Sequence, residues 1–194
     1  MGNFQHTDIP IKYPLAKETI TEVEIQNLIE WLKDYPRLTK GELTVEFEKE
    51  WAKYIGTKYS VFVNSGSSAN LLMVYALKEL GKLDGKVIVP SVGWVTTISP
   101  LIQFGIEPVM VDADKKTFGI DLEQTEFLLK TEEISAIIFV QVLGVPHYKE
   151  ELLRLSEKYN VPLIEDACAS LGSSYEDGTK AGQVGIMSTF SFYF

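Results

Sequence analysis

The chain has 194 residues, of which 45% are apolar and 23% charged, the ordinary balance of a soluble globular protein. Its 27 acidic side chains outnumber the 18 basic ones, and the resulting formal charge of −9 repels a phosphate backbone. The single cysteine, Cys168, excludes an intramolecular disulfide and a zinc site built from several cysteines. We therefore expect no nucleic-acid partner and a reducing, cytoplasmic environment.

The sequence contains no segment that predicts a membrane partner. Residues 1–10 lack both the basic start and the apolar core of a secretory signal. The most apolar stretch, Ala136–Val145, contains Gln141 and is well short of the about 20 apolar residues that a membrane span needs. We expect a cytoplasmic protein.

Two helices are predicted near the N-terminus. Ile20–Lys33 has an amphipathic pattern, and Thr21 with Glu24 has the spacing of a capping box at its start. A second helix is indicated by large apolar residues at helical spacing, followed by Gly56 where a C-terminal cap belongs. The spaced residues are Leu43, Phe47, Trp51 and Tyr54. Because both helices precede the first predicted strand, we expect residues 1–57 to form an N-terminal helical arm or layer.

From Tyr59 onward, short apolar runs alternate with helical segments. The runs are Tyr59–Val63, Lys86–Pro90, Pro108–Asp112, Ala136–Leu143 and Val161–Asp166. The helical segments are Ser67–Leu80, Trp94–Phe104, Leu122–Lys130 and Lys149–Tyr159. Continuous valine and isoleucine runs are typical of strands buried on both faces, and alternation with helices implies parallel pairing through crossovers. We predict an α/β fold over residues 58–194, with three layers (α/β/α) and a mostly parallel sheet.

The last residues, Ser188–Phe194, are predicted to form a further strand. On a strand, Ser191 and Tyr193 would face one side and the three phenylalanines the other. Apolar strand residues at a free end need a partner that covers them. We expect the 194 residues to be part of a longer polypeptide, with the large domain incomplete and a C-terminal small domain absent.

A polar turn follows the first predicted strand and opens a helix. It reads Asn-Ser-Gly-Ser-Ser-Ala-Asn over residues 64–70 and has neither the lysine of a Walker motif nor the pattern G-x-G-x-x-G. Ligands of open α/β sheets collect outside the carboxyl ends of the strands, and free N–H groups at a helix start favour an anion. Gly66 permits close approach and Ser67 adds a hydroxyl. Phosphate binding is therefore one interpretation, and an ordinary capped turn is the other.

Two adjacent carboxylates, Glu165 and Asp166, end the last of the five apolar runs. An acid at the end of a buried strand costs several kcal/mol unless it is paired or hydrogen-bonded. Such a group could bind a metal, act as a base, or hold a protonated ring nitrogen. A hydrogen-bonded helix-capping aspartate is the structural alternative.

Five other side chains are weighed in the same way. Trp94 follows a strand end and could stack on a flat ring, although tryptophan is more often part of a core. Ser191 stands among aromatic residues and could line a ligand pocket or lie on a strand surface. Cys168 has no histidine near it in the sequence, so we interpret it as a small buried thiol. His6 and His147 are too isolated for a metal site, and none is predicted.

Five motifs, taken in chain order, together resemble a known family. They are NSGSSAN, VPSVGW, PVMVD, IEDAC and TFSFYF, within a region from Pro14 to Phe194. Each motif is weak alone, whereas their order and spacing are fairly specific. The chain resembles the DegT/StrS group of sugar-nucleotide aminotransferases, which depend on pyridoxal 5'-phosphate (PLP). This resemblance implies the large domain of a fold type I, aspartate aminotransferase-like transferase.

The resemblance also implies a role for each residue singled out above. Gly66 and Ser67 would bind the cofactor phosphate, and Ser191 would donate a second side-chain hydrogen bond to it. Trp94 would lie against the pyridine ring. Asp166 would pair with the protonated ring nitrogen, which keeps the ring an electron sink. Four separate strand ends would then converge on one flat anionic cofactor.

Partners follow from the same resemblance. The family implies a nucleotide-linked keto-deoxysugar as substrate, as in the synthesis of amino sugars for cell-surface polysaccharides. It implies an amino acid as amino donor, for which we expect glutamate. It also implies a homodimer with active sites at the subunit interface.

Two departures from the family pattern leave three functions open. The lysine that binds the cofactor covalently in the aminotransferases is expected at position 196, outside the 194 residues, and Ala169 stands where these enzymes usually have glutamine. The motifs NSGSSANLLM and VPSVGW are closer to the 3-dehydratase branch, which has histidine in place of that lysine and removes a sugar hydroxyl. We expect an aminotransferase. The alternatives are a 3-dehydratase of nucleotide-linked 4-keto-6-deoxysugars and a non-catalytic PLP-fold binding module.

Overall fold

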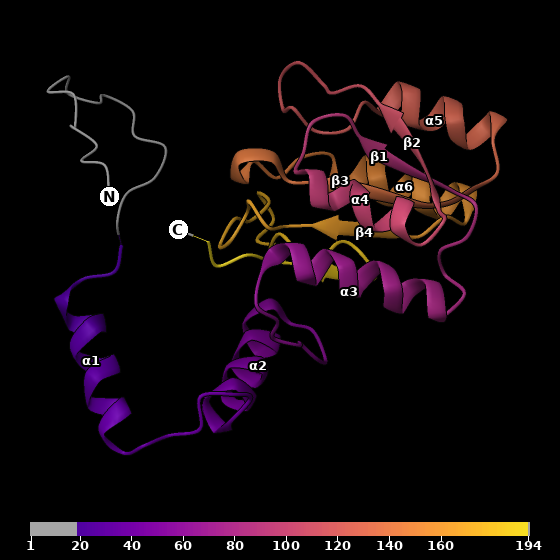
Figure 1. Ribbon diagram of the computed structural model, residues 1–194. Helices are drawn as coiled ribbons and strands as arrows, with labels where there is room; N and C mark the ends of the chain where they lie inside the picture. Colours follow the sequence, from indigo (N-terminus) through magenta and orange to yellow (C-terminus); the bar gives the residue numbers. More distant parts are fainter. Residues whose placement is uncertain (1–18, 194) are drawn as a thin grey trace, which may run out of the picture. The chain divides into compact units, whose positions relative to one another are not determined.

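The computed structural model describes residues 19–193, which fall into two units (Figure 1). The first unit ends at Gly41 and contains helix α1 (Glu22–Lys33), and the second unit is Glu42–Tyr193. The expectations for residues 1–10, His6 and Phe194 lie outside the described residues. In the first unit the predicted capping box is confirmed, because Thr21 N–H donates to Glu24 Oε2 at 2.7 Å and Thr21 Oγ1 accepts from the N–H of Val23.

The second unit is built on one parallel sheet of five strands in the order β2-β1-β3-β4-β5. The strands are β1 (Lys86–Pro90), β2 (Glu107–Val111), β3 (Ile134–Val140), β4 (Leu163–Asp166) and β5 (Ser188–Thr189). All four neighbouring pairs are parallel. Because every strand runs in the same direction, all carboxyl ends meet at one edge of the sheet.

Helices cover both faces of the sheet, which confirms the predicted three-layer α/β/α fold (Figure 1). Besides α2 (Glu42–Ile55), the unit contains α3 (Gly66–Glu79), α4 (Val95–Gln103), α5 (Leu122–Thr131), a short 3-10 turn η1 (Val142–Gly144) and α6 (Lys149–Tyr159). No helix within residues 19–193 combines the length and the apolar character needed to cross a membrane.

The core is divided into two layers by the alternation of side chains along each strand. One layer lies under α3 and α4 and includes Val87, Val89, Ala136, Ile138 and Ile164. The other lies under α5 and α6 and includes Ile88, Ile137, Phe139 and Leu163. Since successive strand residues point to opposite faces, the neighbours Glu165 and Asp166 of β4 leave the sheet on different sides.

The expected strand at Tyr59–Val63 is wrong. These residues form no ladder, and they are attached to helix α2 instead: Phe62 N–H donates to Glu48 Oε1 at 2.9 Å, and the hydroxyl of Ser60 donates to the backbone carbonyl of Glu48. This apolar run is therefore irregular chain next to α2, and one of its backbone N–H groups is bonded to a helix side chain.

The C-terminal strand is shorter than expected. Only Ser188 and Thr189 pair with β4. Of the residues that follow, Ser191 lies against Gly66. Phe190 and Phe192 both make edge-to-face contacts with Trp51 of α2. These contacts group α2 with the sheet, so the division between the units after Gly41 differs from the expected domain boundary at residue 57.

Gly182 generates a prediction about this aromatic packing. It adopts φ +96°, and a Cβ added there would lie 2.1 Å from Cζ of Phe190. Gly178 has a similar φ of +85° but no atom within 4 Å of an added Cβ. Both alanine variants should lose about 1–2 kcal/mol to backbone strain, and Gly182→Ala should lose about 1–3 kcal/mol more through overpacking.

The comparison is made by urea unfolding of the two purified full-length variants. Equal unfolding midpoints for Gly182→Ala and Gly178→Ala would show that Phe190 does not press on this turn.

Candidate functional site

Asp166, the last residue of β4, is the centre of a buried polar cluster. Its side chain is only 2% exposed. Oδ2 accepts hydrogen bonds from the Thr97 hydroxyl at 2.6 Å and from the Asn70 amide at 2.9 Å, while Oδ1 accepts the backbone N–H of Cys168 at 3.1 Å. Among the described residues no cation pairs with this carboxylate. The site is a hydrogen-bonded carboxyl group that lacks a positive partner in this part of the chain.

The polar turn before α3 supplies open backbone donors at the same sheet edge. Ser65 is the N-cap, and its hydroxyl and carbonyl accept the N–H groups of Ser68 and Ala69. Within residues 19–193 the N–H groups of Gly66 and Ser67 donate to no protein group. Together with the positive end of the helix dipole, two free donors make this turn suited to an anion.

Three segments meet tightly at Gly66. A Cβ added there would lie 2.9 Å from Cβ of Ser191 and 3.0 Å from Sγ of Cys168. The C-terminal segment and the residues after β4 therefore press against the first turn of α3. One turn later on α3, Asn70 reaches Asp166. The structure thus brings together Gly66, Ser191 and Asp166, three of the residues selected from the sequence.

Trp94 lies in the turn between the end of β1 and the start of α4. It is the N-cap of α4, makes no side-chain capping bond and is 70% exposed, so the core interpretation is wrong. Thr97, which donates to Asp166, follows one helical turn later. A large aromatic surface is thus left open on the helix whose first turn holds the carboxylate.

Three site residues were missed by sequence reasoning: Asn70, Thr97 and Thr189. Thr189 donates to Oδ1 of Asn70 at 2.6 Å, and Asn70 donates to Asp166. The available signal was helical spacing, because Asn70 lies four residues after Gly66 and Thr97 three residues after Trp94. Polar residues at these positions on otherwise apolar helix faces mark the side that meets the carboxylate.

Glu165 serves a second network, on the face of the sheet opposite to Asp166. It is fully buried and accepts hydrogen bonds from the side-chain amide of Gln141 and from three backbone N–H groups, those of Gly182, Val184 and Gly185. Gln141 also donates to the hydroxyl of Tyr175. Burial raises the pKa of this phenol, so it remains protonated at neutral pH. The network fixes residues 175–185 to the end of the sheet.

Cys168 and His147 do not form a nucleophilic pair or a metal site. Burial, and then the charge of Asp166, raise the pKa of the Cys168 thiol, which keeps it protonated. His147 is buried in a loop, and burial lowers its pKa. No cluster of histidine, cysteine or acidic side chains in residues 19–193 could hold a metal ion.

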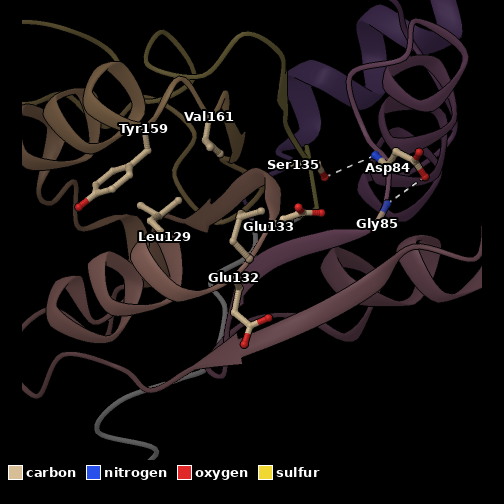
Figure 2. A pocket seen from close by; sticks show the side chains of 9 residues that line it. Asp84, Gly85, Leu129, Glu132, Glu133, Ser135, Tyr159 and Val161 are labelled. Carbon is tan, nitrogen blue, oxygen red and sulfur yellow. Dashed lines mark hydrogen bonds between the residues drawn. The ribbon is translucent and has the colours of Figure 1, made fainter.

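A cavity of about 480 Å³ lies at the other edge of the sheet (Figure 2). Asp84, Gly85, Glu133 and Ser135 line it just before β1 and at the start of β3. One of its acids, Glu132, pairs with Lys86 at 2.7 Å. Because it is at the amino ends of the strands, this cavity is separate from the cluster around Asp166.

The sequence profile of the DegT/DnrJ/EryC1/StrS aminotransferase family matches residues 18–194. The chain belongs to this family. The predicted family resemblance is therefore confirmed, together with the fold that it implied.

Two enzymes are similar to this chain in sequence over most of its length. GDP-4-keto-6-deoxy-D-mannose 3-dehydratase of Yersinia pseudotuberculosis is 42% identical over 190 residues, which cover 96% of this chain and 48% of that protein. GDP-perosamine synthase of Caulobacter vibrioides is 35% identical over 153 residues, covering 79% and 40% of the two chains.

A solved structure of GDP-4-keto-6-deoxymannose-3-dehydratase, with a trapped PLP-glutamate geminal diamine, matches with a TM-score of 0.84 and 36% identity. The match covers 94% of this chain and 47% of that one. The chain thus spans about half the length of the curated relatives it matches.

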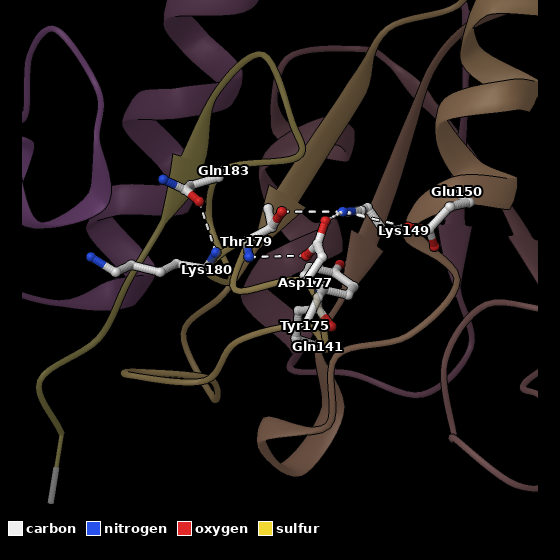
Figure 3. A network of polar contacts seen from close by, with 8 residues as sticks. All are labelled: Gln141, Lys149, Glu150, Tyr175, Asp177, Thr179, Lys180 and Gln183. Atoms are coloured by element: carbon white, nitrogen blue, oxygen red, sulfur yellow. Dashed lines mark hydrogen bonds and ion pairs between the residues drawn. The ribbon is translucent and has the colours of Figure 1, made fainter.

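The Lys149–Asp177 ion pair of the second network generates a pH prediction. Lys149 donates to Asp177 and to the hydroxyl of Thr179, and this contact is the main cause that lowers the pKa of Asp177 to about 2 (Figure 3). A depressed carboxyl pKa contributes stability above its ordinary pKa, and this stability is lost as the pH falls towards 2. The difference in stability between wild type and Asp177→Asn should therefore shrink as the pH falls from 4.

The measurement is urea unfolding of the full-length protein between pH 7 and pH 3 at low salt. Glu176→Gln, at the neighbouring exposed carboxylate, is the control. A difference that stays constant across this range would mean that the ion pair does not stabilise the loop.

Proposed function

We propose that this chain forms the PLP-binding part of an enzyme that acts on nucleotide-linked 4-keto-6-deoxysugars. The single observation that carries the proposal is the meeting of an open helix start, at Gly66 and Ser67, with a buried carboxylate, Asp166, through Asn70. PLP carries an anionic phosphate at one end and a protonatable ring nitrogen at the other. The described residues fit such a group at both ends.

In this proposal each side chain has a distinct task. The N–H groups of Gly66 and Ser67, with the hydroxyl of Ser191, hold the phosphate. Trp94 lies against the ring with its exposed face. Asp166 accepts the ring N–H and supplies the negative charge that favours the protonated ring. The bound cofactor provides an electron sink for bond cleavage next to the sugar carbonyl.

A 3-dehydratase is the first candidate for the reaction. It is supported by the Yersinia pseudotuberculosis relative, whose match has both the higher identity and the higher coverage of this chain. An aminotransferase is the second candidate, supported by the match to GDP-perosamine synthase. In either case we infer a GDP-linked sugar as substrate, glutamate as amino donor, a homodimer and a cytoplasmic location.

The two reactions are separated by their products. The full-length protein, loaded with PLP, is incubated with GDP-4-keto-6-deoxymannose and glutamate, and the sugar is analysed by mass spectrometry. Loss of the 3-hydroxyl identifies the dehydratase, and a new amine identifies the aminotransferase. Absence of both products with a cofactor that still binds would support a non-catalytic PLP-binding module. Failure to bind PLP would overturn the proposal.

Asp166→Asn provides a second test. The variant keeps the shape of the side chain but removes the charge, and one charge-assisted hydrogen bond contributes about 1.5–3 kcal/mol. We expect PLP affinity to fall by about ten-fold or more, since about 1.4 kcal/mol corresponds to ten-fold, with turnover falling further. Absorbance titration and steady-state kinetics measure the two effects. Asp84→Asn, exposed at the opposite sheet edge, is the control; unaltered turnover in Asp166→Asn would remove Asp166 from the mechanism.

A further inference from the structure

Asn70 is a buried amide that joins three elements of the candidate site. It lies on α3, one turn after Gly66, and is 2% exposed. Its Nδ2 donates to Asp166 Oδ2 at the end of β4, and its Oδ1 accepts from the hydroxyl of Thr189 on β5. Ser191, two residues after Thr189, lies against Gly66. The turn, the carboxylate and the C-terminal segment therefore share one side chain.

The direction of these hydrogen bonds follows from chemistry. An ionised carboxylate only accepts, so the amide nitrogen of Asn70 must face Asp166. Its carbonyl oxygen must then face Thr189, whose hydroxyl donates. The Cys168 thiol, kept protonated by burial, lies 3.8 Å from the Thr189 oxygen and donates weakly to it. Every donor in the chain from Cys168 to Asp166 thus points towards the carboxylate.

The two adjacent carboxylates differ in how completely they are satisfied. An ionised carboxylate has about four lone-pair positions, two on each oxygen. Glu165 fills them with four donors, two on Oε1 and two on Oε2. On Asp166, Asn70 and Thr97 fill Oδ2, whereas Oδ1 accepts the backbone N–H of Cys168. The Cys168 thiol also interacts with this carboxylate. Within residues 19–193, the two short side-chain hydrogen bonds are therefore both on Oδ2, and Oδ1 is the less occupied oxygen.

We propose that Asn70 is a positioning residue that selects the oxygen of Asp166 that meets the cofactor. By occupying Oδ2 together with Thr97, it leaves Oδ1 as the acceptor for the ring N–H. Through Thr189 and α3 it also holds this oxygen at a set place relative to the phosphate turn at Gly66. The inference rests on the proposed binding of PLP and extends it to a residue that would not itself touch the cofactor.

The test is a double-mutant cycle on PLP affinity in the full-length protein. Asn70→Leu has a similar shape and removes both hydrogen bonds, and Asp166→Asn removes the charge through which Asn70 is proposed to act. Apparent dissociation constants come from absorbance titration of the apo-protein with PLP. Thr125→Val is the control, because Thr125 is a fully buried threonine on α5 whose hydroxyl donates only within its own helix.

We expect Asn70→Leu to weaken PLP binding about ten-fold, the size of one lost charge-assisted hydrogen bond. In the Asp166→Asn background the same change should weaken binding less than two-fold, because the charged carboxylate on which Asn70 is proposed to act has gone. Thr125→Val should lower the unfolding temperature and leave PLP affinity unchanged.

Two outcomes overturn the inference: wild-type affinity in Asn70→Leu, or a full ten-fold loss that persists in the Asp166→Asn background. The second would mean that Asn70 acts on the fold as a whole. If wild type itself fails to bind PLP, the proposed function fails first. If Asn70→Leu does not fold, Thr189→Val replaces it in the cycle, since it removes the donor to Asn70 and the weak acceptor of the Cys168 thiol but no donor to Asp166.

Discussion

The site depends on a carboxyl group that is buried and that, within residues 19–193, has hydrogen-bond donors but no cation as partners. Placing a carboxylate in a protein interior costs several kcal/mol, and neutral donors offset this cost only when each is held in place. For Asp166 those donors come from α3, α4 and the backbone after β4, so the carboxylate needs all three elements in register. The same requirement brings the helix start at Gly66 and the strand end together. Folding the sheet edge and forming the site are therefore one process.

Alternation along a single strand separates support from chemistry. Glu165 and Asp166 are neighbours with the same functional group, but they leave β4 on opposite faces and meet different partners. Glu165 accepts three backbone N–H groups from the loop at 182–185, which leads directly into β5 and Ser191. Glu165 thus fixes the path of the segment that carries Thr189 and Ser191 to the face of the sheet where Asp166 lies. The two carboxylates form one unit, in which one orders the backbone and the other remains able to accept a ligand.

The fold was predictable because the buried strands are continuous apolar runs, such as Val87–Pro90 and Ala136–Val140, and helical segments separate them. The error at Tyr59–Val63 has a different origin: an apolar run forms a strand only where a neighbouring strand pairs with it, and in the described residues this run contacts Glu48 of α2 instead. Likewise, Gly66 and Asp166 stand out by position, whereas Asn70 and Thr97 gain meaning only when the helices are placed over β4. Local sequence patterns therefore identify Gly66 and Asp166. The residues that connect them, such as Asn70, are identified only from tertiary contacts.

This division also explains why cofactor and reaction are separable in the chain. Every residue proposed to hold PLP, from Gly66 to Ser191, belongs to the part of the chain that lies at one edge of the parallel sheet. This chain matches both a 3-dehydratase and a GDP-perosamine synthase over most of its length. The residue that we expect to distinguish them, at position 196, would follow Ser191 by five positions, and Ser191 itself lies against Gly66. A change there would alter how a proton is handled while the grip on the ring and phosphate stays the same. In this proposal the two reactions share the residues that hold the cofactor and differ at one residue beside them.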